Sequence, residues 1–435
     1  MTTEKSAKPA PLHSNSVDQQ KRHTLKNLAK LGLCAGIASK APYVYAKKDF
    51  TLRILGTHVT LQEELRLQAQ KDLGINIKFE PKGSAAVLQK ASMSPASFDL
   101  YEQWSNSINV LWQSGAIQPI EKKRIRYWDE INSLTQTGKL KDDAKIGAGD
   151  APYKIINVQK DGSLGKQHTD QVSFLPYVHN VDSFGYNTEY IPKGIPYETE
   201  SWGWLLDSQH AGKVAIVNAP TIGLFDLALA VQAKGLMQFA DIGNMSPAEL
   251  DNLFRILTQF KRDHHFSGFW TSVPESVQFM QSKRVNIESM FSPAVASLNG
   301  QGVPVVYAAP KEGYRGWHGV MCLSANTQGS VKDAAYEYMN WWLSGWPGAF
   351  IARQGYYISN PQRSKSLLSQ DEWDYWYEGQ TAASDLKGSD GKVSVLQGDK
   401  RTGGSYETRF SNVAVWNTVM PTYDYSLQKW YEFIS

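Results

Sequence analysis

The chain has 435 residues, of which 42% are hydrophobic and 20% charged, and its formal net charge is +3. This balance is typical of a folded globular protein, and it excludes a disordered or a membrane-embedded chain. The length exceeds what one small core needs and predicts two domains or one two-lobed protein.

The first 46 residues have the pattern of a cleaved export signal. The basic stretch QQKRHTLKNLAK precedes the mildly apolar LGLCAGIAS, and APYVYA then offers small residues for cleavage after Ala46. The pair Lys21-Arg22 resembles a twin-arginine signal, but lysine stands first in the pair, which leaves the export route open. The alternatives are an amphipathic helix docked on the body and a lipoprotein signal at Cys34.

Without this segment the chain is nearly neutral. The segment holds seven Lys/Arg and two Asp/Glu, so the rest of the sequence carries 38 basic and 40 acidic residues. This balance gives no electrostatic footprint for nucleic acid. Cys322 is the one cysteine left, so we expect no internal disulfide, no thiolate metal cluster and no cofactor.

From residue 50 onward, strand and helix patterns alternate. Strands are predicted at 50–57, 75–80, 97–104, 212–218, 284–291 and 303–309, and helices at 61–74, 84–93, 219–235, 245–263, 275–283, 292–302 and 330–345. Two charged, glycine-containing segments, 121–150 and 385–405, are predicted to be insertions or surface loops. Alternation of this kind predicts an α/β fold with mostly parallel sheets covered by helices on both faces.

Five segments carry motifs in an order that resembles a known family. They are FDLYEQWSNSINVLWQSGAIQPIEKKRI, SFLPYVHNVDSFGYNTEYIP, ESWGWLLDSQHAGKVAIVNAP, the stretch from RVNIESMF through PKEGYRGWHG to LSAN, and GWPGAFIARQGYYISNP. They are similar to segments of the periplasmic spermidine/putrescine-binding proteins. The resemblance implies a periplasmic-binding-protein-like α/β fold, in which a two-strand hinge joins two lobes with mostly parallel central sheets.

The same resemblance implies a function and a domain division. The function is that of a periplasmic, monomeric solute-binding protein, which captures a small polyamine-like or other nitrogenous solute by closure of two lobes and delivers it to an ABC permease and its ATPase. The first lobe is expected at 47–173 plus 319–365, and the second at 174–318 plus 366–435.

The resemblance also implies ligand-binding residues. Where the family forms an aromatic box around the ligand, this sequence has Phe291 and Trp317. The remaining candidate contacts are Trp104, Ser105, Asn106, Thr57, His58, His318 and Thr221.

The family's ammonium-binding carboxylates are missing, because their positions fall on Pro220, Gly223 and Gly319. Three charge-assisted hydrogen bonds amount to about 5–9 kcal/mol, whereas a micromolar ligand has about 8 kcal/mol in total. Either other carboxylates replace them or the solute is not a polyamine. The nearest candidate replacements are Glu102, Asp226 and Glu288.

An anionic group on the solute is an alternative. The free N–H groups at the start of the 219–235 helix are suited to bind an anion. Arginines available to pair with it are Arg315, Arg353 and Arg409.

Two other functions share this sequence pattern. An exported enzyme on the same fold is disfavoured, because the sequence has no GxSxG, HExxH or GxxxxGK[ST] motif. A ligand-sensing subunit of a receptor complex would leave the same sequence. Non-catalytic binding of a solute is therefore the leading prediction.

Overall fold

The computed structural model describes residues 50–435, which belong to one compact unit. The predicted export signal lies outside the described residues. Within residues 50–435, no helix has the length and apolar character needed to cross a membrane.

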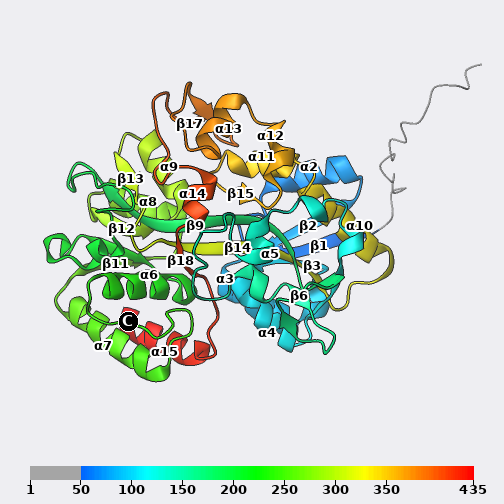
Figure 1. Cartoon of the computed structure of the whole chain (residues 1–435), viewed down its shortest axis with the longest axis horizontal. Coiled ribbons are helices and arrows are strands. Elements are labelled where there is room, and N and C mark those ends of the chain that lie inside the picture. The colour runs from blue at the N-terminus through cyan, green and yellow to red at the C-terminus, as the bar shows by residue number, and fades with distance from the viewer. Residues whose placement is uncertain (1–49) are drawn as a thin grey trace, which may run out of the picture. The chain divides into compact units, whose positions relative to one another are not determined.

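Parallel strands form one end of a large sheet (Figure 1). The central strand β1 (Thr51–Gly56) pairs in parallel with β2 (Asn76–Pro81) and β3 (Leu100–Trp104). The helix α2 (Glu63–Leu73) buries Leu65 and Ala69 and ends at Gly74, whose left-handed φ of 67° a glycine adopts without strain. The other helices here are α3 (Ser84–Met93) and α4 (Ile108–Gln113), followed by the short strand β4 (Ile117–Gln118).

The other end of the sheet repeats this arrangement. There β10 (Val214–Val217) pairs in parallel with β11 (Phe266–Trp270) and β12 (Ile287–Met290). The long helix α7 (Pro247–Arg262) begins with a capping box in which the Ser246 and Glu249 side chains each bind the other's backbone N–H. The remaining elements are α6 (Pro220–Ala233), α8 (Val273–Gln281), α9 (Ser292–Gly300) and β13 (Val305–Tyr307).

Two long antiparallel strands connect these ends. They are β9 (Leu175–Asn187) and β14 (Tyr314–Ser324), and every residue of both is buried. They pair with each other, while β9 also pairs with β12 and β14 also pairs with β3, so the sheet order is β11-β10-β12-β9-β14-β3-β1-β2. These two strands therefore lie in the middle of one continuous sheet and join its two ends.

Two smaller groups of elements surround this frame. The segment between β4 and β9 contains β5 (Ile120–Glu121), α5 (Ser133–Thr137), β6 (Asn157–Val158), β7 (Leu164–Gly165) and β8 (Gln171–Val172), whose strands form a separate small sheet. After β14 come α10 (Gly329–Trp342), α11 (Trp346–Ala352), β15 (Tyr357–Ile358), α12 (Pro361–Lys365), α13 (Gln370–Trp376), β16 (Leu386–Lys387), β17 (Val393–Val395), α14 (Tyr406–Phe410), β18 (Val413–Trp416) and α15 (Tyr423–Ile434).

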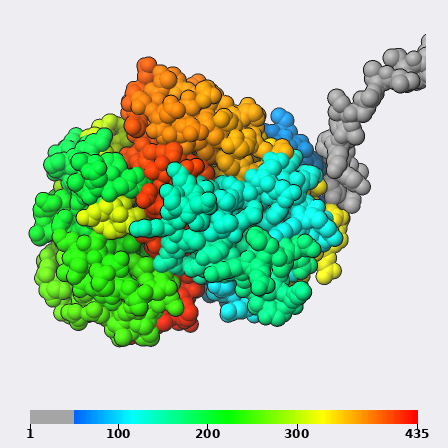
Figure 2. Space-filling view, in the orientation of Figure 1, coloured from blue at the N-terminus to red at the C-terminus, as the bar shows by residue number. Residues whose placement is uncertain are grey.

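The C-terminal part of the chain contacts both ends of the sheet. The residues from α13 to α14 lie against α11 through the Arg353–Glu372 ion pair, at 2.5 Å, and β17 packs beside α9. The strand β18 adds to β14 in parallel, and α15 packs on α7. Figure 2 shows this last part of the chain, in red, as a strip between the green and the cyan surfaces.

The α/β prediction is confirmed by this topology. The predicted strands and helices are found with boundaries that differ by a few residues. Segment 385–405 forms the β16–β17 hairpin and loops, whereas segment 121–150 adds short elements to the small sheet and to the packing around α5.

Gly319 marks a tight contact between the two long strands. The register between β9 and β14 shifts next to this residue, and a Cβ atom built on it would lie 2.7 Å from the Val178 carbonyl oxygen. A backbone atom inside a sheet cannot move aside as the end of a side chain can. Any larger residue at this position must therefore displace one of the two strands.

We predict that Gly319→Ala lowers the free energy of unfolding by about 1–3 kcal/mol, because it overpacks this contact. The measurement is urea denaturation of the variant and the parent protein. Gly300→Ala is the control, because a Cβ at that helix end meets no atom of the described residues within 4 Å. Equal urea midpoints for the two variants would contradict the prediction.

Candidate functional site

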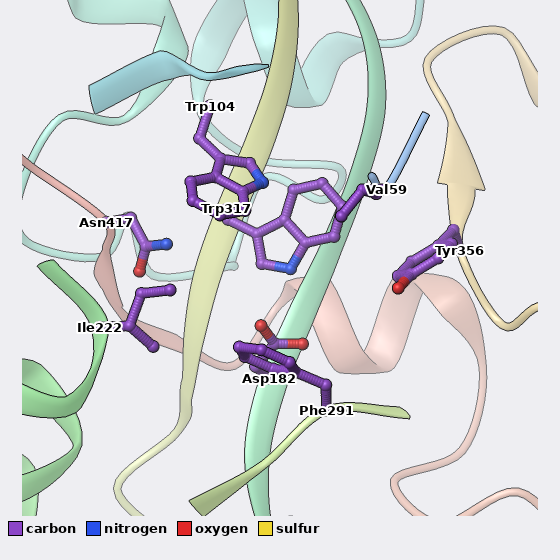
Figure 3. A pocket seen from close by; sticks show the side chains of 8 residues that line it. All are labelled: Val59, Trp104, Asp182, Ile222, Phe291, Trp317, Tyr356 and Asn417. Atoms are coloured by element: carbon purple, nitrogen blue, oxygen red, sulfur yellow. The ribbon is translucent and has the colours of Figure 1, made fainter. Parts of the chain in front are cut away.

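A cavity lies beside the middle of the paired strands β9 and β14, which run from one end of the sheet to the other. It encloses about 320 Å³ of space between atoms, including its opening to solvent. Figure 3 shows the Trp317 side chain among the lining residues, with Trp104 on one side and Asp182 and Phe291 on the other. The lining consists of Val59, Trp104, Asp182, Ile222, Phe291, Trp317, Tyr356 and Asn417.

The topology explains why these residues meet. Trp104 ends β3 and pairs with Gly319 of β14, two residues from Trp317. Met290 ends β12 and pairs with Ser183 of β9, next to Asp182. The carboxyl ends of strands from both ends of the sheet therefore converge on the middle of the crossing pair, which is the usual place for a ligand in an open α/β sheet.

Four of the eight residues that line the cavity are aromatic. The Trp317 ring lies 6.4 Å from that of Trp104 and 5.6 Å from that of Tyr356, centroid to centroid, both edge to face. The Trp270 ring packs edge to face against the Phe291 ring, with 5.1 Å between the ring centroids. Trp104 and Phe291 remain partly exposed, so their rings are accessible from the cavity.

A buried charge cluster forms the floor. Arg315 donates from Nε to Asp226 Oδ1 at 2.7 Å, from one terminal nitrogen to Asn417 Oδ1 at 3.0 Å, and from the other to Asp182 Oδ2 at 3.4 Å. The Tyr307 hydroxyl lies 3.3 Å from the other Asp182 oxygen. Burial raises the pKa of Asp182, and the nearby Arg315 charge opposes that rise; burial likewise raises the pKa of Asp226 to about 6.

The three predicted replacement carboxylates do not line the cavity. Asp226 is fully buried and holds Arg315. Glu102 accepts from the Tyr177 hydroxyl at 3.0 Å, and Glu288 accepts from Ser276 Oγ at 3.1 Å. These carboxylates are bound by local partners within the fold, and the acidic residue of the lining is Asp182, which the sequence analysis did not select.

Three of the predicted contacts, Trp317, Phe291 and Trp104, line the cavity. The other candidates lie beside lining residues without lining the cavity themselves. Thr57 and His58 precede Val59, Ser105 and Asn106 follow Trp104, and Thr221 precedes Ile222. Of these, His58 is exposed, Thr221 is half-buried and the rest are buried.

His318 is the exception, because it lies on the opposite face of β14. Successive side chains of a strand point to opposite faces, and Trp317 lies on the face that lines the cavity. His318 instead stacks on His179 at 4.8 Å and contacts Thr135 Oγ1 at 3.0 Å. Burial lowers the pKa of His318 to about 4. The structure thus places it as a neutral histidine inside the fold, away from the cavity.

The arginines suggested as partners of an anionic solute do not line the cavity. Arg353 pairs with Glu372, and Arg409 is buried, donates to the Thr402 carbonyl oxygen at 2.8 Å and lies 5.0 Å from the centre of the Tyr314 ring. Arg315 faces two carboxylates. At the start of α6, the N–H groups of Ile222 and Gly223 bind the Ala219 carbonyl oxygen. An anion site at this helix end has little support from the structure.

The comparison with known families agrees with this geometry. Residues 66–376 match the model of the family described as bacterial extracellular solute-binding protein. The chain belongs to this family. The family is described as solute-binding, and a cavity between the two ends of the sheet is consistent with that role.

Solved structures share the fold at low identity. A putative spermidine/putrescine ABC transporter from Listeria monocytogenes has a TM-score of 0.62 at 15% identity and covers 88% of this chain and 98% of its own. The spermidine/putrescine substrate-binding protein PotD from Streptococcus pneumoniae has 0.59 at 15%, with 88% and 99% covered. AgtB from A. tumefaciens R10, in complex with agropinic acid, has 0.54 at 12%, with 89% and 99% covered. These similarities confirm the periplasmic-binding-protein-like fold.

Several lining residues were missed by the sequence analysis. Val59, Tyr356 and Asn417 lie at element ends, where the sequence gives little indication of direction. Asp182 did leave a signal, because it is a carboxylate within the otherwise largely apolar stretch LPYVHNVDSFGYN. A charge in a strand that is buried throughout requires a partner or a ligand.

We predict that Glu102→Gln stabilises the protein at pH 8 by about 1–3 kcal/mol. Burial raises the pKa of Glu102 from its ordinary 4.5 to about 7, so between these values the unfolded chain loses a proton that the folded chain keeps. The stability of the parent protein therefore falls as the pH rises through this window, and the penalty is constant above it. Glutamine removes the penalty.

The measurement is urea denaturation at pH 4.5 and pH 8. Glu64→Gln, which changes an exposed carboxylate on α2, should shift the midpoint equally at both pH values. If the gain of Glu102→Gln over the parent protein does not increase with pH, this account of Glu102 is wrong.

Proposed function

We propose that this protein is the solute-binding component of an ABC importer and that a small nitrogenous solute binds in the cavity at the β9–β14 crossing. The observation that carries the proposal is the origin of the lining, since Trp104 comes from one end of the sheet and Phe291 from the other. A ligand that touches both favours the arrangement in which they approach each other. The family membership supports this role.

The lobes proposed are those of the sequence analysis, 47–173 plus 319–365 and 174–318 plus 366–435. The strands β9 and β14 act as the hinge, because they are the long strands that both ends of the sheet share. Closure leaves the solute chemically unchanged, and the protein acts by binding rather than catalysis.

Export and delivery complete the proposal. Residues 1–46 direct the chain to the periplasm and are removed after Ala46. The mature protein is a monomer that docks in its closed form on a membrane permease driven by an ATPase. The similar spermidine/putrescine transporter proteins and the agropinic acid complex support a nitrogen-containing solute.

We predict that at least one compound in a panel of polyamines, amino acids, betaines, choline and small organic acids raises the melting temperature of the full chain, because a ligand that binds the folded form stabilises it. Trp317→Ala should abolish the shift for that compound, since it removes the central ring of the lining. The measurement is thermal unfolding with and without each compound.

Trp112→Ala is the matched control. Trp112 is partly buried, donates Nε1 to the Gly162 carbonyl oxygen and lies outside the cavity lining, so this variant should keep the full ligand-induced shift. A shift that survives Trp317→Ala would remove this cavity as the binding site, and a panel without any shift would contradict the proposed function.

A further inference from the structure

The composition of the lining distinguishes between classes of solute. Of the eight residues that the structure places around the cavity, Asp182 alone is charged, and its side chain is 4% exposed. Four others are aromatic: Trp104, Phe291, Trp317 and Tyr356. Aromatic faces and one carboxylate attract a positive charge.

The charge cluster below the cavity pairs Arg315 with two carboxylates. The buried Arg409 adds a second positive charge nearby, which also favours the ionised form of Asp182. The arginine favours Asp226, at 2.7 Å, over Asp182, at 3.4 Å. The contacts to Asp182 from Arg315 and Tyr307, at 3.4 and 3.3 Å, are both longer than ordinary hydrogen bonds. The Trp317 side chain also favours the ionised form of Asp182. Asp182 is thus a buried carboxylate whose contacts to Arg315 and Tyr307 are long, and it faces the cavity.

The largely aromatic lining suits a methylated ammonium better than a primary one. A primary ammonium carries three N–H donors. Among the described side chains of the lining, the acceptors are Asp182, the Tyr356 hydroxyl and the Asn417 amide oxygen, which already accepts from Arg315. A methylated nitrogen has no donors to satisfy and presents its charge through methyl groups, which pack against aromatic faces.

We propose that the cavity takes an organic cation with one positive centre, a quaternary ammonium that lies against the aromatic wall above Asp182. This inference rests on the proposed function, because it names the solute class of the same site. A diamine is disfavoured, since the part of the lining that the structure describes offers its second ammonium no carboxylate. The cation lies beside the one carboxylate of the lining and favours the ionised form of Asp182.

The experiment is isothermal titration of the full chain with three probes. Choline is the single cation, 3,3-dimethylbutan-1-ol is its neutral isostere, and putrescine is the dication. We expect choline to bind about tenfold or more tightly than either of the others, because the alcohol lacks the charge and putrescine leaves one ammonium without a partner. Equal or tighter binding of the neutral isostere or of putrescine would overturn the proposal.

A pair of variants tests the role of the carboxylate. Asp182→Asn should weaken choline binding about tenfold or more and reduce the preference for choline over its neutral isostere. Glu288→Gln, which also neutralises a buried carboxylate but lies outside the lining, should change neither value. Undiminished choline preference in Asp182→Asn would overturn the proposal; the comparison of probes on the parent protein decides the matter if this variant does not fold.

The outcomes also separate this inference from the proposed function. If choline fails to bind while another compound raises the melting temperature through Trp317, the assigned solute class is wrong and the proposed function stands. If no compound binds at all, both are wrong.

Discussion

The contact between Arg315 and its two carboxylates is the constraint on which the middle of the molecule depends. Arg315 lies on β14, Asp182 on β9 and Asp226 on α6, and each is almost fully buried. A buried ion cluster of this kind costs desolvation energy, and loss of one partner leaves an unpaired charge inside the fold. The cluster therefore fixes the register of the two crossing strands and the position of α6 against them. These three elements contribute Trp317, Asp182 and Ile222 to the cavity lining, so the cluster also sets the positions of these side chains.

Because side chains alternate along a strand, the two faces of the β9–β14 pair have different properties. On one face, Trp317 and Asp182 contribute to the cavity; on the other, His318 and His179 stack within an aromatic cluster that includes Tyr406 and Phe410. The rings of this second face fill space that would otherwise be void, and the buried histidines are neutral because burial lowers the pKa of both. One pair of strands thus supplies both a binding surface and the packed support behind it.

Much of the fold was predictable because it depends on local patterns. Alternating strands and amphipathic helices, the capping box at Ser246 and the glycine stop at Gly74 are properties of short segments. The site was only partly predictable. Trp317, Phe291 and Trp104 came from the order of motifs. Glu102 and Glu288 were chosen by proximity in sequence, and the fold instead pairs them with Tyr177 and Ser276. His318 lies on the face of β14 opposite to Trp317, as the period of a strand indicates. The β9 segment marks Asp182 as a charge in a buried strand, but its position opposite Arg315 depends on the register of β9 with β14, which is a long-range property.

The same charge arrangement connects recognition with closure. A cavity walled by aromatic rings has a low local dielectric, so the burial of an ionised carboxylate at its floor is unfavourable while the cavity is closed and empty. In the proposed function, a cation that enters contacts rings from both ends of the sheet, so it would stabilise the closed arrangement through charge and through contact. The free energy available for closure is the difference between its affinities for the two arrangements. An uncharged molecule of the same shape supplies only the contact, and the buried charge would continue to oppose closure around it.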